Sequence, residues 1–162
     1  MQARFNAAKA APGALQAMLQ LQGYVERSGL DHTLVHLVKM RASQINGCAY
    51  CIDMHSKDAL AMGESAQRLL ALDAWRETPF FTERERAALA WTEAVTLVHQ
   101  GHVPDAVYEE ARRHFGEEEL VNLTMAVIAI NAWNRVAIPF RTVPGSYVSP
   151  HAAKPEPAMA TA

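Results

Sequence analysis

The sequence has little that would indicate a nucleic-acid partner, an anionic membrane surface or a disulfide-stabilised scaffold. Only 2 of its 162 residues are cysteine, aromatic residues make up 7%, and the formal charge is -2 with a pI near 6.4. So small a net charge does not provide the basic surface that binds nucleic acid or acidic lipid. The two cysteines lie three positions apart, so they cannot close a long loop. The pair therefore needs a local explanation, in redox chemistry or in metal binding.

The sequence also lacks a long, uninterrupted hydrophobic run. Its first residues, Met1 to Asn6, contain no continuous apolar segment of the kind found in a secretory signal. The most apolar stretch, residues 120–138, is interrupted by asparagine, threonine and arginine, whereas a membrane span needs about 20 predominantly apolar residues. These features predict a cytoplasmic protein with no membrane span, in which residues 120–138 form a buried helix.

Proline and glycine divide the chain into segments, and nearly all of these segments have helical rather than alternating periodicity. Thr82 and Glu85 form a capping-box pattern, Pro104 suits a first helical position, and Pro139 is expected to end the last helix. The predicted helices cover about residues 12–28, 32–46, 48–62, 65–75, 82–100, 104–115 and 117–138.

This pattern predicts an all-α, single-domain bundle of about six or seven helices. The domain is expected to cover residues 1–145, and a Pro/Ala-rich tail is expected over residues 146–162. The last predicted helix is apolar around much of its circumference. It is therefore expected to be either the central core helix or a contact between subunits.

The part of the sequence that carries most chemistry is residues 41–55, where both thiols and a histidine lie within eight positions. A turn at Asn46-Gly47 would place Cys48 at a helix N-terminus, where free amides and the helix dipole favour a thiolate. Cys51 and His55 follow at intervals of three and four residues, so the three side chains share one helix face. Peroxide reduction needs a thiolate nucleophile, a proton donor and a second thiol that resolves the sulfenic acid. This segment contains all three.

Two other interpretations of the same residues remain open. His36, Cys48, Cys51 and His55 form a Cys2His2 set that could bind zinc, with His36 folding back from the preceding helix. Alternatively, the cysteines are small buried hydrophobic residues and His55 is a core histidine, as isolated cysteines and histidines usually are.

Residues 45–55, Ile-Asn-Gly-Cys-Ala-Tyr-Cys-Ile-Asp-Met-His, resemble the AhpD-like alkylhydroperoxidase branch of the carboxymuconolactone decarboxylase superfamily. The resemblance extends to residues 37–43, 86–93 and 131–135, and it covers roughly residues 10–145. It implies an all-helical, AhpD-like protomer that assembles as a homo-oligomer, either a trimer or a hexamer. No metal or organic cofactor is expected. The decarboxylase branch lacks the dithiol, so decarboxylation of a lactone is disfavoured.

The resemblance also implies roles for individual residues. Cys51 is expected to be the peroxidatic nucleophile, Cys48 to resolve it as a disulfide, and His55 to belong to a proton relay. The substrate would be a peroxide. An external dithiol, which is a lipoylated protein in the best-known members, would then reduce the disulfide.

Two positions depart from the family pattern. His36 stands where the family has the glutamate that serves as the base of the relay, and Tyr50 stands where well-studied members have a histidine. A neutral His36 can accept a proton, whereas a protonated one would stabilise a thiolate without acting as a base. The sequence is thus compatible with a working relay, with a metal site, or with a helical scaffold whose redox site has decayed.

Overall fold

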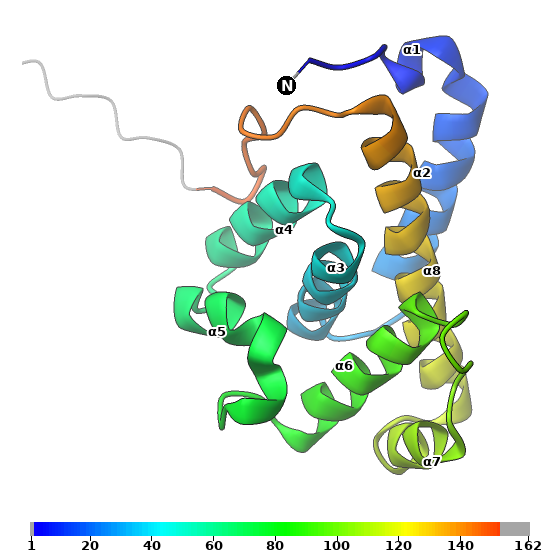
Figure 1. The fold of residues 1–162 in the computed structure, drawn as a ribbon, viewed down its shortest axis with the longest axis vertical. Helices are drawn as coiled ribbons and strands as arrows, with labels where there is room; N and C mark the ends of the chain where they lie inside the picture. Colours follow the sequence, from blue (N-terminus) through cyan, green and yellow to red (C-terminus); the bar gives the residue numbers. More distant parts are fainter. Residues whose placement is uncertain (1, 153–162) are drawn as a thin grey trace, which may run out of the picture.

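The computed structural model describes residues 2–152, and every regular element in this range is a helix (Figure 1). The elements are α1 (Ala7–Ala10), α2 (Pro12–Glu26), α3 (His32–Asn46), α4 (Ala49–Ala61), α5 (Ala66–Ala71), the 3-10 helix η1 (Leu72–Glu77), α6 (Glu83–Thr96), α7 (Asp105–His114) and α8 (Glu117–Phe140). The predicted all-α class is therefore confirmed. The structure adds the short α1, and it divides the segment predicted as one helix at 65–75 into α5 and η1.

Several helices begin where the sequence places a capping residue. The side chain of Asp31 accepts a hydrogen bond from the backbone N–H of Leu34 at 2.9 Å, which fixes the start of α3. Thr82 and Glu85 form the complete capping box at the start of α6. Pro12 occupies the first turn of α2, where its missing N–H costs nothing.

Two helix ends differ from the prediction. α6 ends at Thr96 rather than near Gln100, because the backbone beyond Thr96 closes into turns such as the 2.7 Å bond from the Gln100 N–H to the Leu97 carbonyl. α8 continues through Pro139 to Phe140. The N-terminal arm caps this helix end, where the last carbonyls have no partner within the helix. Arg4 donates from its guanidinium to the Pro139 carbonyl at 3.0 Å and from its backbone to the Phe140 carbonyl at 3.1 Å.

The centre of the bundle is formed by α3 and α8, which lie side by side with α2, α4 and α6 around them (Figure 1). One buried cluster joins α2, α3, α6, α7 and α8, and a second joins α3 and α4 to α5, η1 and α6. A third, smaller cluster contains the two cysteines and residues of α3 and α8. The dithiol segment is thus held between the two central helices.

By length and composition, α8 is the one helix among residues 2–152 that is apolar enough to cross a membrane. It packs instead along α2, α3 and α6, and its buried residues include Leu123, Val127 and Ile130. Core packing is therefore one of its roles, as the sequence suggested. Its outer face exposes Val121, Ile128 and Ile138, so a subunit contact there remains a prediction.

Candidate active site

The turn between α3 and α4 places Cys48 at the beginning of a helix. Gly47 has a φ of 66°, in the left-handed region that glycine adopts without strain, and this residue ends α3. The backbone N–H of Cys48 then donates to the Ser43 carbonyl at 2.9 Å. Cys48 is the N-cap of α4, and its sulfur accepts a hydrogen bond from the Cys51 N–H at 3.4 Å. The predicted placement of the first cysteine at a helix start is therefore observed.

Cys48 and Cys51 form a disulfide, with their Cα atoms 5.4 Å apart. Their exposed fractions are only 1% and 2%, and Ala42, Ile130 and Ala137 complete the buried cluster around them. Tyr50 and Trp133, which are partly buried, pack against this cluster. The structure therefore represents the oxidised form of the pair, shielded from water.

His55 lies one turn after Cys51 on α4 and is also buried, with an exposed fraction of 6%. Burial lowers its pKa to about 3, and the positive charges of Lys39 and His36 act in the same direction. Its Nδ1 atom has no hydrogen-bond partner among the described residues. His55 is thus a neutral imidazole next to the redox pair.

His36 projects from α3 and lies close enough to His55 to affect its charge. Burial lowers the pKa of His36 as well, followed by the charge of Lys39, while Asp58 opposes them. Its Nε2 atom lies 3.1 Å from the Met62 sulfur. Both histidines named from the sequence therefore favour the neutral form.

The donors of the alternative zinc site are not gathered. Among residues 2–152, no three side chains of the types histidine, cysteine, aspartate and glutamate are placed to bind one metal ion. The two sulfurs are bonded to each other, and the Nε2 atom of His36 faces a methionine. The geometry therefore favours a redox pair over a Cys2His2 centre.

Lys39 is a buried residue near the site that the sequence did not indicate, and its exposed fraction is 7%. It lies three residues after His36 and four before Ser43, so the three side chains share one face of α3. This spacing was visible in the sequence, but a lysine is ordinarily assumed to be on the surface. Its charge is one of the causes that lower the pKa of both histidines.

A polar network connects the turn before Cys48 to α8, and it also went unnoticed in the sequence. The Asn46 side-chain amide donates to the side-chain oxygens of Asn131 at 3.0 Å and Asn134 at 2.8 Å. Asn134 in turn donates to the Ser43 hydroxyl at 3.1 Å, and Asn131 donates to the Thr96 hydroxyl at 3.0 Å. Hydrogen bonds between α3 and α8 thereby fix the position of the Asn46-Gly47 turn.

The segment after α8 covers one side of α4. The Tyr147 hydroxyl donates to Asp58 at 2.9 Å, and the Gly145 N–H donates to Asp53 at 2.9 Å. Burial, followed by Asp58, raises the pKa of Tyr147 to about 12. The predicted boundary between a domain at 1–145 and a tail at 146–162 remains a prediction, since residues 153–162 lie outside the described range.

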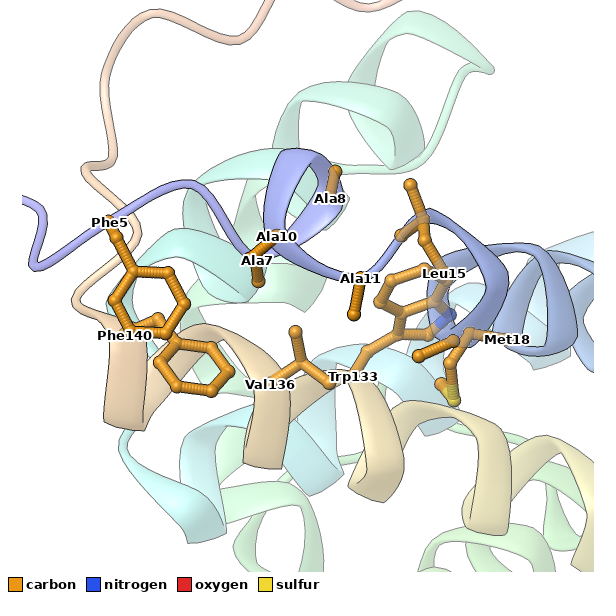
Figure 2. Close-up of a pocket in the computed structure, with 11 residues that line it drawn as sticks. Phe5, Ala7, Ala8, Ala10, Ala11, Leu15, Met18, Trp133, Val136 and Phe140 are labelled. Carbon is orange, nitrogen blue, oxygen red and sulfur yellow. The ribbon is translucent and has the colours of Figure 1, made fainter.

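An apolar cavity of about 380 Å³ lies between the N-terminal helices and α8 (Figure 2). Phe5 and Phe140 close one end, with ring centroids 4.6 Å apart, and Leu15 and Met18 lie at the other (Figure 2). Trp133 belongs both to this cavity and to the surroundings of the disulfide. The remaining lining residues are Ala7, Ala8, Ala10, Ala11, Ala14 and Val136.

Solved structures with the same fold include redox-related proteins. A protein of unknown function from Agrobacterium tumefaciens, provisionally described as the antioxidant defence protein AhpD, is 46% identical. The alignment covers 90% of this chain and 100% of that one, with a TM-score of 0.88. The debrominase Bmp8 shares the fold at 21% identity and a TM-score of 0.77, over 85% of this chain and 74% of its own.

Two sequence relatives and a family model also match the chain. The uncharacterized protein YdfG of Bacillus subtilis is 41% identical over 85% of this chain and 94% of its own length. YnjA of Escherichia coli, also uncharacterized, is 35% identical over 65% of this chain and 58% of its own. Residues 12–94 match the carboxymuconolactone decarboxylase family, a range that includes α3, the dithiol turn and α4. The chain therefore belongs to the carboxymuconolactone decarboxylase family, as an AhpD-like member.

Proposed function

We propose that the protein is a thiol-dependent peroxidase of the alkylhydroperoxidase type, which cycles between the Cys48–Cys51 dithiol and its disulfide. One observation above all supports this function: the two cysteines are bonded at the buried start of α4, one turn before a neutral histidine. The description of the Agrobacterium tumefaciens relative as an antioxidant defence protein agrees with it.

In the proposed cycle, the Cys51 thiolate attacks one peroxide oxygen, so that an S–O bond forms as the O–O bond breaks. The leaving oxygen takes up a proton and departs as an alcohol or as water. Cys51 is then a sulfenic acid. The Cys48 thiol attacks this sulfur, the disulfide forms, and the hydroxyl group leaves as water. An external dithiol, such as a lipoylated protein, reduces the disulfide and is itself oxidised to a disulfide.

The proton of the Cys51 thiol is proposed to move through His55 and His36. Because the pKa of His55 is about 3, this imidazole can take part in a transfer but does not retain the proton. His36 is nearer the surface and is less strongly perturbed, so it is suited to exchange the proton with solvent. In this way His36 would replace the relay glutamate of the family.

Two further parts of the proposal concern the protein's setting. Cytoplasmic location, where thiol reductants are available, remains the prediction from the sequence. A homo-oligomer, trimer or hexamer, would bury the exposed apolar residues of α8, namely Val121, Ile128 and Ile138.

The test is peroxide consumption by the reduced protein in the presence of excess dithiol. We expect Cys51→Ser to abolish turnover, and Cys48→Ser to consume one equivalent of peroxide and stop with a sulfenic acid at Cys51. Ala49→Ser, an exposed position in the same turn, is the matched control and should turn over normally. If the reduced wild type consumes no peroxide, the redox-decayed scaffold is the better interpretation. If Cys48→Ser rather than Cys51→Ser abolishes the first equivalent, the two roles are reversed.

A further inference from the structure

Lys39 is a buried lysine whose ammonium has no hydrogen bond or ion pair within residues 2–152. Its exposed fraction is 7%, and it projects from the middle of α3. The surface Lys9 is exposed, and Lys57 pairs with Asp53 at 2.9 Å. Burying an ammonium without a close partner is costly, and an apolar residue of similar size would normally be more stable there. A position with this cost calls for a functional explanation.

The surroundings of Lys39 connect it to the redox pair. His36 lies one turn before it on α3, and Ser43, one turn after it, accepts the backbone hydrogen bond from Cys48 at 2.9 Å. Lys39 therefore lies one helical turn before the residue whose backbone carbonyl holds the first cysteine. The neighbouring helix α4, which packs against α3, contributes Cys51 and His55, both buried.

The charged groups around this cluster come from four segments. Glu26 at the end of α2 and Asp58 on α4 attract the Lys39 ammonium, although burial outweighs them and lowers its pKa. His32 on α3 and His151 in the C-terminal segment add positive charge near His36. Neither carboxylate forms an ion pair with Lys39, and Asp58 instead accepts from the Tyr147 hydroxyl. No ion pair within residues 2–152 therefore neutralises Lys39, and its charge acts on both imidazoles.

We propose that Lys39 is a positioning residue for the dithiol: its buried ammonium adds to the effect of burial in keeping His36 and His55 unprotonated, and it attracts the thiolate of Cys51. Two like charges in a poorly solvated cluster repel each other, so an imidazolium next to Lys39 releases its proton quickly. A thiolate in the same place is instead stabilised. The arrangement therefore moves the proton away from Cys51 while it retains the negative charge on sulfur.

The proposal uses the proposed function only for the choice of Cys51 as the nucleophile, and its test needs no peroxide. The rate of alkylation of the reduced Cys48→Ser protein by iodoacetamide, followed against pH, reports the thiolate of Cys51. In this background we expect Lys39→Met to move the midpoint of the alkylation profile to higher pH by about one unit, the size of effect that a nearby charge has on a pKa. Lys39→Arg should keep the wild-type midpoint, because it keeps the charge.

A second readout separates this role from a merely structural one. The imidazole protons of His36 and His55, followed by NMR, should show both pKa values rising in Lys39→Met. Entry of water after loss of a packing contact would also raise them, but it would lower the pKa of Cys51. Only loss of the Lys39 charge should therefore raise the pKa values of both histidines and of Cys51 together. Lys9→Met makes the same substitution on an exposed surface and should change neither profile.

Three outcomes would overturn the proposal. They are an unchanged alkylation midpoint in a folded Lys39→Met protein, a Lys39→Arg midpoint that moves as far as that of Lys39→Met, and an ordinary pKa for His55 in the unsubstituted protein. The last measurement requires no variant, so it decides even if Lys39→Met fails to fold. If the alkylation and NMR profiles behave as expected but the reduced protein does not turn over peroxide, the result contradicts the proposed function and not the role of Lys39.

Discussion

The buried His55 should make the protein unstable in mild acid. In the unfolded chain this histidine titrates near its ordinary pKa of about 6.5, whereas in the folded protein burial lowers its pKa to about 3. As the pH falls, the unfolded state therefore binds the proton first. The stability that the neutral His55 contributes is complete above pH 6.5 and is lost progressively between pH 6.5 and 3. Each pH unit in this window costs about 1.4 kcal/mol. Between pH 7 and pH 4.5 the loss from His55 is about 2.5 kcal/mol.

Urea unfolding of the disulfide form at pH 7.0 and 4.5 measures this loss, and His55→Leu isolates it. Leucine cannot titrate, and because His55 Nδ1 has no partner among the described residues, its replacement sacrifices little hydrogen bonding there. The free energy of unfolding of the variant should therefore fall about 2.5 kcal/mol less than that of the wild type over the same pH interval. His99→Leu, at an exposed site, is the control and should behave as the wild type does. Equal losses in the wild type and His55→Leu would refute the assignment of His55 as a buried neutral imidazole.

Three further predictions address the oligomeric state, the stabilising role of Glu93 and the proton relay. Light scattering should give a mass several times the 17.8 kDa of one chain, and a monomer at micromolar concentration would contradict the proposed oligomer. Glu93→Ala should lower the free energy of unfolding in urea by about 3–5 kcal/mol, because this carboxylate accepts from Arg41 at 2.8 Å, Trp75 at 2.9 Å and Arg76 at 2.6 Å. Glu119→Ala, at a more exposed site, should lower it by about 1 kcal/mol or less. His36→Ala should lower kcat/KM for peroxide by roughly 10²- to 10⁴-fold, and unchanged turnover would remove His36 from the relay.

The helices were largely predictable because their ends depend on local chemistry. Asp31, Thr82 and Glu85 cap their helices through bonds that span three residues, and such bonds can be inferred from spacing alone. The end of α8 could not be inferred in this way, because the carbonyls of Pro139 and Phe140 are capped by Arg4, which lies 135 residues before Pro139. The short α1 belongs to this same N-terminal arm, and its few residues show no periodicity.

The redox pair was predictable for the same reason, since a CxxC motif at a helix start is a local pattern. The side chains that surround it were less so. Asn134 reaches Asn46 across 88 positions, and Tyr147 reaches Asp58 across 89, so neither partner could be assigned before the fold was known. Lys39 was overlooked for a different reason: its type suggests the surface, and only tertiary packing buries it.

The substitution of His36 for the family glutamate changes the electrostatics of the site as well as its proton carrier. A glutamate at position 36 would stand one helical turn from Lys39, at the i, i+3 spacing where opposite charges pair. That pair would neutralise the ammonium and weaken its effect on His55 and on the sulfurs. With a neutral imidazole at position 36, the negative charges that attract the Lys39 ammonium within residues 2–152 are those of Glu26 and Asp58. If Lys39 acts on the thiolate as proposed, thiol activation in this protein should therefore depend more on Lys39 than on a strong base at position 36.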